Sequence, residues 1–461
     1  MYQKHQHIHF VGIGGIGMSG IAELLVNLGH RVSGSDLKAS EATRRLARLG
    51  AVVHEGHRGG QVQGADVVVI SSAVKEDNPE VAAARELLIP VIPRAEMLAE
   101  LMRLKYGLAV AGAHGKTTTT SMLAHLLAAG GLDPTVVVGG RLGALGHNAW
   151  LGKGDFLVAE ADESDGSFNI LSPVVVVVTN VDREHMDFYG SDEALDEAFV
   201  RFMNKVPFYG AAVVCLDDPR LAGLIPRLRK RAITYGITSQ ADYQAREIVN
   251  QGLATEFEFL LRGEPKGRVR LPLPGRHYVH NALGAIAAAV EVGVPVDAAL
   301  AACAGFAGVK RRFEQKGRTA AGALVMDDYA HHPTEIRATL EAARAAFPQQ
   351  RLVVAFQPHR YTRTQDLFEE FATAFYGADE LLVLDIYAAG EKPIAGMHAE
   401  RLAEAIRAHG HRRVEYVGAA AAAAQRLAGL IEPTDVLFTM GAGDVWRLGE
   451  GLVAPEPEGE R

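Results

Sequence analysis

The sequence predicts an α/β protein built from three domains. Short apolar runs alternate with amphipathic segments along nearly the whole chain, which is the pattern of stacked βαβ units. The chain has 461 residues, too many for one hydrophobic core. We expect a Rossmann-like domain over residues 1–104, a central domain with a mostly parallel sheet over 105–308, a second Rossmann-like domain over 309–453, and a disordered, charged tail over 454–461.

Apolar runs bounded by turn residues mark the expected strands. In the first domain these are Ile8–Val11, Val67–Ile70 and Val91–Ile92. In the central domain they are Gly107–Ala111, Phe156–Ala159, Val174–Thr179 and Ala212–Cys215, followed by the alternating segments Thr255–Leu261 and Arg268–Leu271. In the last domain they are Leu324–Met326, Leu352–Phe356, Glu380–Leu384 and Val436–Thr439. Helices are expected over His280–Val290, after a Pro-Gly turn, and over the alanine run 419–424.

Composition excludes several classes of protein. A formal net charge of −8 argues against broad nucleic-acid binding. No apolar run approaches the length of a membrane helix, so we expect no membrane insertion. Cys215 and Cys303 lie in apolar contexts, which predicts buried packing residues and a reducing, cytoplasmic setting. We expect a monomer or a homodimer.

A glycine-rich turn follows the first expected strand. Gly12, Gly14 and Gly17 form G-x-G-x-x-G before a helical pattern, and Asp36 follows about 20 residues beyond it, where it can accept hydrogen bonds from ribose hydroxyls. Glycines allow the backbone to approach a pyrophosphate at the start of a helix. The motif does not distinguish NAD, FAD and UDP-sugars, and a turn that binds nothing stays open as an alternative.

A second loop, between a strand and a helix, has the residues of a phosphate site. Gly115-Lys116-Thr117 matches the end of a Walker A motif, in which the lysine neutralises the β/γ-phosphates and the threonine contacts Mg²⁺. Glu160 ends a nearby strand, where such enzymes place a metal carboxylate. His185, between acidic residues, is a candidate second metal ligand. These features predict a P-loop ATPase domain over 105–308.

Polar clusters follow two strands of the last domain. One is the segment Asp327–Pro333, which includes Tyr329 and His331, and the other is Gln357–Arg363. Ligands of open parallel sheets bind beyond the carboxyl ends of the strands. Tyrosine, histidine and arginine at two such ends suit a small zwitterion, whose carboxylate an arginine can grip in a fork. The alternative is a capped helix beside surface arginines.

Together these motifs resemble the Mur ligases of peptidoglycan synthesis, over roughly residues 8 to 450. The segments that carry the resemblance are Ile8–Gly20, Gly112–Thr119, Glu160–Asp165, Thr179–Asp187, His280–Asn281, Arg311–Phe313, Asp327–Pro333, Phe356–Thr364 and Gly441–Gly443. Ala113 stands where the family usually has threonine, and Gly284 where it commonly has an asparagine.

The resemblance implies an activity and assigns roles. It implies ATP-dependent, Mg²⁺-dependent (Mn²⁺ is an alternative) ligation of L-alanine to UDP-N-acetylmuramate through an acyl phosphate, giving UDP-N-acetylmuramoyl-L-alanine, ADP and phosphate. ATP would be bound by Gly112, His114, Gly115, Lys116, Thr117, Thr118, Asn281, Arg312 and Asp328, and metal by Thr117, Glu160 and His185. The substrates would be bound by Gly14, Gly15, Ile16, Gly17, Asp36, Ser71, Tyr329, His331, His359, Arg360 and Arg363, and the catalytic residues would be Lys116, His185, Arg312 and His331, the last as proton acceptor.

Three other functions stay open at this point. The nearest attaches a whole tripeptide to the same sugar nucleotide, with a similar sequence and a different acceptor pocket. An NAD-dependent oxidoreductase would use the first glycine turn, although the phosphate loop and Glu160 speak against it. A nucleotide-binding regulator without enzymatic activity is the third.

Overall fold

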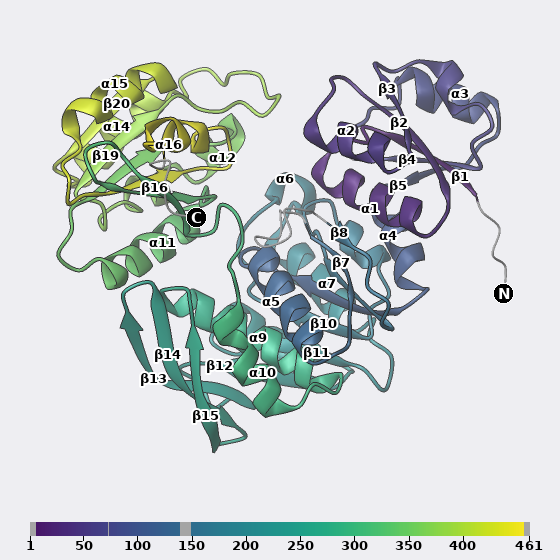
Figure 1. Cartoon of the computed structure of the whole chain (residues 1–461), viewed down its shortest axis with the longest axis horizontal. Coiled ribbons are helices and arrows are strands. Elements are labelled where there is room, and N and C mark those ends of the chain that lie inside the picture. Colours follow the sequence, from purple (N-terminus) through teal and green to yellow (C-terminus); the bar gives the residue numbers. More distant parts are fainter. Residues whose placement is uncertain (1–5, 72, 139–148, 456–461) are drawn as a thin grey trace. The chain divides into compact units, whose positions relative to one another are not determined.

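A computed structural model describes residues 6–71, 73–138 and 149–455 (Figure 1). The chain divides into two compact units, which are Met1–Glu247 with Phe257–Val269 and His280–Ala307, and Ile248–Glu256 with Arg270–Val279 and Gly308–Arg461. Three sheets, of five, ten and six strands, organise the chain. The architecture is α/β with three domains, as the sequence predicts, whereas the exact domain boundaries stay predictions.

The first sheet has the order β3-β2-β1-β4-β5, and all of its pairs are parallel. Its strands are β1 (His7–Val11), β2 (Arg31–Asp36), β3 (Val52–Glu55), β4 (Val67–Ile70) and β5 (Val91–Pro93), and its helices are α1 (Ile16–Asn27), α2 (Glu41–Arg48), α3 (Pro79–Glu86) and α4 (Arg94–Met102), with the 3₁₀ turn η1 (Gly59–Val62). The strand order reverses between β1 and β4, and ligands of doubly wound sheets bind beside such a switch point.

The second sheet runs β15-β14-β13-β12-β11-β10-β6-β9-β7-β8. Its strands are β6 (Tyr106–Ala111), β7 (Thr135–Val137), β8 (Ala149–Trp150), β9 (Phe156–Glu160), β10 (Val175–Val178), β11 (Ala211–Cys215), β12 (Ala232–Gly236), β13 (Tyr243–Gln251), β14 (Ala254–Leu261) and β15 (Glu264–Leu271). From β12 to β7 all pairs are parallel, and β7–β8 is antiparallel. The central strand β6 lies between β10 and β9, so the loops after these three strands reach the same edge.

The helices of this part lie between its strands along the chain or follow the last strand, β15. They are α5 (Lys116–Ala129), η2 (Ser167–Ile170), α6 (Met186–Tyr189), α7 (Asp192–Met203), α8 (Pro219–Leu224), η3 (Ile225–Arg227), α9 (Arg276–Glu291), α10 (Val296–Ala302) and η4 (Cys303–Gly305). Strands β10 and β11 are buried throughout, which explains their uninterrupted apolar sequences.

The third sheet has the order β16-β17-β21-β18-β19-β20 and is parallel except for β16. Its strands are β16 (Glu314–Arg318), β17 (Leu324–Asp328), β18 (Leu352–Phe356), β19 (Glu380–Leu384), β20 (Val414–Gly418) and β21 (Val436–Met440). Its helices are α11 (Pro333–Ala346), α12 (Tyr361–Asp366), α13 (Phe368–Ala372), α14 (Ala399–Ala408), α15 (Ala420–Leu430) and α16 (Trp446–Leu452). The loops after β17, β18 and β21 therefore emerge from three adjacent strands.

The expected strands and both expected helices are confirmed, with ends shifted by a few residues. Cys215 and Cys303 are buried free thiols, as predicted. In the described ranges, no helix is both long and apolar enough to cross a bilayer. Most of the predicted tail, residues 456–461, lies outside the described part of the chain.

Candidate active site

The glycine turn after β1 is fixed by the end of β2. The backbone N–H groups of Gly12 and Ile13 both donate to the carbonyl of Ser35, at 2.8 and 2.9 Å. The N–H of Gly14 donates to Asp36 Oδ2 at 2.8 Å. Helix α1 then starts at a glycine N-cap that has no side-chain cap. The result is a tight turn before an uncapped helix start, a geometry that favours anions.

Neighbouring side chains approach two glycines here closely. A Cβ at Gly14 would lie 2.8 Å from Asp36 Oδ2, and one at Gly17, in the first turn of α1, would lie 2.8 Å from Nη1 at the end of the Arg94 side chain. Gly15 hydrogen-bonds back to Gly12, while Ser71 follows β4 across the switch point and accepts a hydrogen bond from Val74. The predicted residues of this site therefore come together, except that the side chain of Ile16 lies outside the described part.

Asp36 holds the glycine turn in place. Its two carboxylate oxygens accept from the N–H groups of Gly14 and Leu37. A contact with a ribose stays a prediction. A cavity of about 200 Å³ adjoins this residue at the ends of β2 and β3, and its polar lining includes Lys38, Arg44 and His54.

The phosphate loop connects β6 to α5 and depends on two glycines with positive φ. Gly112 has φ +130° and Gly115 φ +82°. A Cβ at Gly112 would lie 2.2 Å from Thr179 Oγ1, so a side chain is excluded there. Helix α5 begins at Lys116 and has no side-chain cap. As in the first turn, the uncapped N–H groups at the helix start suit a phosphate.

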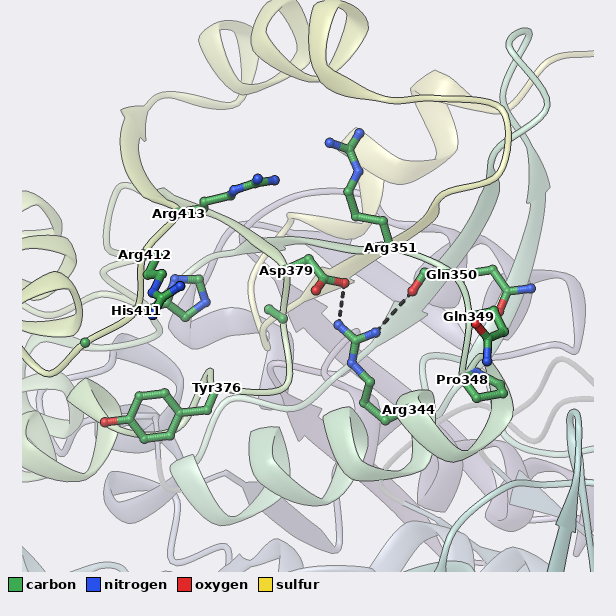
Figure 2. A pocket seen from close by; sticks show the side chains of 12 residues that line it. Arg344, Pro348, Gln349, Gln350, Arg351, Tyr376, Asp379, His411, Arg412 and Arg413 are labelled. Carbon is green, nitrogen blue, oxygen red and sulfur yellow. Dashed lines mark hydrogen bonds and ion pairs between the residues drawn. The ribbon is translucent and has the colours of Figure 1, made fainter.

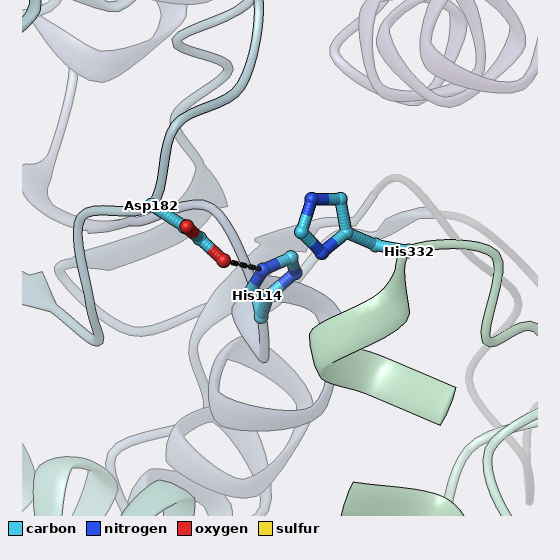
Figure 3. A group of neighbouring side chains, drawn as sticks. All are labelled: His114, Asp182 and His332. Atoms are coloured by element: carbon cyan, nitrogen blue, oxygen red, sulfur yellow. Dashed lines mark hydrogen bonds and ion pairs between the residues drawn. The ribbon is translucent and has the colours of Figure 1, made fainter. Parts of the chain in front are cut away.

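Residues after β10 hold the phosphate loop from the neighbouring strand. Asn180 Oδ1 accepts from the N–H of His114 at 2.9 Å, and Thr179 Oγ1 and Asn180 Nδ2 donate to the His114 carbonyl at 2.6 and 3.0 Å. His114 Nε2 lies 2.9 Å from Asp182 Oδ2, a contact drawn in Figure 3. These bonds hold the phosphate loop in place.

Lys116 is the ionic centre of the loop. Its Nζ donates to the carbonyls of Gly112 and Ala113, at 2.6 and 3.1 Å, and to Glu163 Oε1 at 2.7 Å. Burial works against the charge, but the Glu163 carboxylate outweighs it and raises the pKa of Lys116. Burial also raises the pKa of Glu163 to about 7, opposed by the Lys116 ammonium.

Glu163, Glu184 and His185 form a candidate cation site beside Lys116. One ligand atom from each lies within 4.8 Å of the others. His185 has φ +57° at the start of α6, and its Nε2 lies 3.9 Å from Glu163 Oε1. Glu163 Oε2 is buried without a hydrogen-bond partner among the described residues. Carboxylate oxygens suit Mg²⁺, so the donor set fits a divalent cation. Glu160 ends β9, as predicted.

Helix α9 brings Asn281 to the phosphate loop. A Cβ on Gly115 would lie 2.6 Å from Asn281 Oδ1. The preceding residue, His280, is held by Asp217, whose Oδ2 lies 2.8 Å from Nε2. Asp217 also accepts from Ile237, Thr238 and Ser239, so it ties the start of this helix segment to the β12–β13 connection. Thr117 and Thr118 occupy the first turn of α5, with Thr118 buried.

In the C-terminal domain, Asp328 and Arg312 lie together. Asp328 ends β17 and accepts from the N–H groups of Phe313 and Ala330, at 2.7 and 2.8 Å. Burial raises its pKa to about 6, while the Arg312 charge opposes this rise. The Arg312 guanidinium lies 5.0 Å from the ring centre of Tyr329, and its Nη1 lies 3.9 Å from Glu335. Arg312, Asp328 and Tyr329, which are three of the predicted site residues, therefore lie close together.

His331 and His359 form an aromatic group with Tyr329 and Tyr387. The His331 ring meets Tyr329 edge-on at 5.2 Å and His359 at 6.0 Å. His359 stacks on Tyr387 at 5.5 Å. Burial, followed by the charges of His331, Arg363 and Arg360, lowers the pKa of His359 to about 4. His331 Nδ1 lies 3.0 Å from Glu335 Oε2.

Arg360 is held in an unusual backbone conformation. Its φ is +70°, its N–H donates to the Tyr387 carbonyl at 2.8 Å, and its Nε donates to Glu391 Oε1 at 2.6 Å. Glu391 also accepts from Thr362. A cost in backbone strain with several compensating bonds is typical of functional positions.

A different cavity in this domain lies away from these residues. It has a volume of about 670 Å³, and its lining includes Arg344, Arg351, Asp379 and Arg413. Figure 2 shows Arg344 bonded to Asp379 and to the Gln350 carbonyl. Arg351, Asp379 and Arg413 each immediately precede β18, β19 or β20, so the cavity faces the amino ends of the strands. Ligand sites of open sheets lie at the opposite edge.

Several residues of these sites were not predicted individually. They are Glu163, Asn180, Glu184, Asp217, Glu335 and Glu391. Three of them carried a signal in the sequence, because Glu163 lies three residues after Glu160, and Asn180 and Glu184 lie in the segment that contains His185.

Two uncapped helix starts after parallel strands, one with a lysine and a carboxylate cluster, are the arrangement of a nucleotide-binding α/β protein. The family models agree: residues 7–106 match the Mur ligase family catalytic domain, 110–289 the Mur ligase middle domain, and 311–443 the Mur ligase glutamate ligase domain. The chain belongs to the Mur ligase family.

Relatives and solved structures similar to this chain span almost its whole length. The chain is 56% identical over 454 residues to a UDP-N-acetylmuramate–L-alanine ligase of Desulfatibacillum aliphaticivorans, covering 98% of this chain and 99% of that one. It is 57% identical to a protein of the same name from Geotalea daltonii, covering 98% of each. A crystal structure of UDP-N-acetylmuramate–alanine ligase from Thermotoga maritima has a TM-score of 0.83 at 30% identity, covering 97% of this chain and 98% of that one.

Proposed function

We propose that this protein is an ATP-dependent ligase that joins L-alanine to UDP-N-acetylmuramate and releases UDP-N-acetylmuramoyl-L-alanine, ADP and phosphate. Mur ligases are ATP-dependent amide ligases. The observation that carries the proposal is the identity of 56–57%, over almost the full length, to proteins with that printed activity. Membership of this family also displaces the NAD-dependent oxidoreductase and the non-enzymatic regulator.

The first half-reaction makes an acyl phosphate. The lactyl carboxylate of the muramic acid attacks the γ-phosphorus of ATP, and the bond from that phosphorus to the β,γ-bridging oxygen breaks to leave ADP. The loop N–H groups and Lys116 stabilise the charge that develops on the phosphate oxygens. Glu163, Glu184 and His185, with Thr117 and Glu160, are the residues that would hold Mg²⁺, and Mn²⁺ is an alternative. When bound, the cation supplies further charge neutralisation at the phosphates.

The second half-reaction forms the amide. The neutral amine of alanine attacks the acyl carbon, a proton leaves the nitrogen, and the tetrahedral intermediate expels phosphate. We assign His331 as the proton acceptor and Arg360 and Arg363 as carboxylate-binding residues. Supporting observations are the contact of His331 with Glu335 and the ion pair of Arg360 with Glu391. A glutamate partner fixes an imidazole in one tautomer and orientation.

The sugar nucleotide is assigned to the N-terminal glycine turn. The turn at Gly14 and Gly15 and the start of α1 at Gly17 contact the pyrophosphate. Asp36, at the end of β2, and Ser71, after β4, lie on either side of this turn. The support is the uncapped helix start and the adjoining cavity at Asp36. A cytoplasmic setting and a monomeric or dimeric state stay predictions.

Phosphate release tests the proposal. The assay contains UDP-N-acetylmuramate, ATP and Mg²⁺, with L-alanine, L-serine, glycine or the tripeptide L-alanyl-γ-D-glutamyl-meso-diaminopimelate added one at a time. We expect the highest kcat/KM with L-alanine and no steady release when any one substrate is omitted. A preference for the tripeptide would replace the proposal with the tripeptide-ligase activity that a fold neighbour's title names.

A further inference from the structure

A buried carboxylate joins four segments of the N-terminal domain. Glu80, in the first turn of α3, is fully buried. Its Oε1 lies 3.1 Å from His9 Nε2, and its Oε2 accepts from Ser35 Oγ at 2.5 Å and contacts His57 Nδ1 at 2.9 Å. These partners belong to β1, to β2 and to the connection after β3. Burial works against the carboxylate, but hydrogen bonds from His9, Ser35 and His57 lower the pKa of Glu80.

Ser35 transmits this contact to the glycine turn. While its side chain is bound to Glu80, its carbonyl accepts from the N–H groups of Gly12 and Ile13. The next residue, Asp36, accepts from the N–H of Gly14. Three consecutive N–H groups of the turn are therefore fixed by two residues at the end of β2, and Glu80 anchors the first of these two residues.

A second arm of the network extends from Glu80 to His7. His7 Nδ1 faces the Gly64 carbonyl, His7 Nε2 faces Ser33 Oγ, Ser33 Oγ faces His9 Nδ1, and His9 Nε2 faces Glu80. Glu80 is therefore the end point of a chain of hydrogen bonds that runs through His9 and Ser33 to His7.

Stability alone is a weak reason for such a network. A buried charged group is often replaced by well-packed apolar side chains at no loss of stability, whereas removal of one partner leaves the other unpaired. Glu80 links directly to the residue that shapes the turn, so a role in ligand binding is the better explanation.

We propose that Glu80 is a positioning residue for the sugar nucleotide. It holds Ser35, and through Ser35 the turn Gly12–Gly14, in the conformation that receives the pyrophosphate, without touching the ligand itself. This inference rests on the proposed function of the glycine turn.

Glu80→Gln tests it most directly. Glutamine keeps the size of the side chain but replaces one acceptor oxygen with an amide donor, so it cannot accept from His9, Ser35 and His57 together. We expect the Kd and KM for UDP-N-acetylmuramate to rise about tenfold, because binding must then also order the turn that Glu80 no longer holds. We expect kcat at saturation and the KM values for ATP and L-alanine to stay within about twofold of the wild-type values.

Glu76→Gln is the matched control. It is the same substitution four residues earlier, in an exposed ion pair with Arg85, and should leave all constants unchanged. Ser35→Ala, which keeps the carbonyl and removes the hydroxyl, should raise the KM for the sugar nucleotide in the same direction. If Glu80→Gln does not fold, the KM of Ser35→Ala for the sugar nucleotide tests the inference instead.

Two results would overturn the inference. One is a folded Glu80→Gln protein that binds the sugar nucleotide as tightly as the wild type, and the other is an equal rise in the KM for ATP. A wild-type protein that fails to bind UDP-N-acetylmuramate in calorimetry would remove the proposed function as well, so the two failures can be told apart.

Discussion

Lys116 Nζ lies 2.7 Å from Glu163 Oε1, inside a loop that is otherwise shaped to receive phosphate. The ammonium is thus held in position by a carboxylate and by two carbonyls of its own loop. The same oxygen, Glu163 Oε1, lies 3.9 Å from Nε2 of His185 in the candidate cation site. Glu163 therefore connects the lysine to the residues that would hold the cation.

Lys116→Ala should abolish turnover and leave binding of the sugar nucleotide largely intact. The lysine supplies charge at the γ-phosphate, whereas the UDP group is assigned to another domain. Steady-state phosphate release and calorimetry with UDP-N-acetylmuramate measure the two effects. An equal loss of both would contradict the assignment of the two loops.

Glu163→Gln should lower kcat by about 100-fold and raise the Mg²⁺ concentration required for half-maximal rate, because it removes one charged cation ligand and the partner of Lys116. A magnesium titration at saturating ATP measures both. Glu193→Gln, on the exposed surface of α7, is the control. An unchanged Mg²⁺ dependence would show that Glu163 only supports the loop.

Arg360→Ala should raise the KM for L-alanine about tenfold or more and change the KM for ATP far less, because a guanidinium–carboxylate contact is lost. Glu391→Gln should also raise the KM for L-alanine, but by less, because it frees the Arg360 guanidinium from its ion pair without removing it. Initial rates at varied alanine and varied ATP test this. If the KM values for ATP and L-alanine rose by the same factor, Arg360 would not belong to the amino-acid site.

His359 should make stability depend on pH. Its pKa falls from the usual 6.5 to about 4 in the folded protein, so between these values the unfolded chain binds the extra proton and the folded protein does not. The contribution of His359 is complete above pH 6.5 and is lost as the pH falls toward 4. Urea unfolding of wild type and His359→Gln at pH 7.5 and 5 should show a smaller loss for the variant. An equal loss of stability in wild type and variant would show that His359 does not cause the pH dependence.

Much of the fold could be predicted because parallel strands that are buried on both faces have continuous apolar sequences. β10 and β18 are examples, buried at every position. The edge strands β3 and β16 were not predicted, because they are partly exposed and carry polar residues instead of a continuous apolar run. The edge strands β5 and β15 were predicted.

The site could be predicted as far as local motifs reach. The glycine turns, Lys116 and His185 follow from short stretches of sequence whose geometry is local. Partners that come from other parts of the chain could not be found this way. Glu391 is 31 residues from Arg360, and Glu80 is 71 residues from His9, so only the folded chain pairs them.

The central claim is that one chain binds a sugar nucleotide and a nucleoside triphosphate at the same time, at separate helix starts. The most direct measurement is calorimetric titration of UDP-N-acetylmuramate into protein already saturated with a non-hydrolysable ATP analogue and Mg²⁺. Binding at one site per chain, with the ATP analogue retained, is the result we expect. Displacement of the analogue by UDP-N-acetylmuramate, or no binding of UDP-N-acetylmuramate at all, would contradict the account.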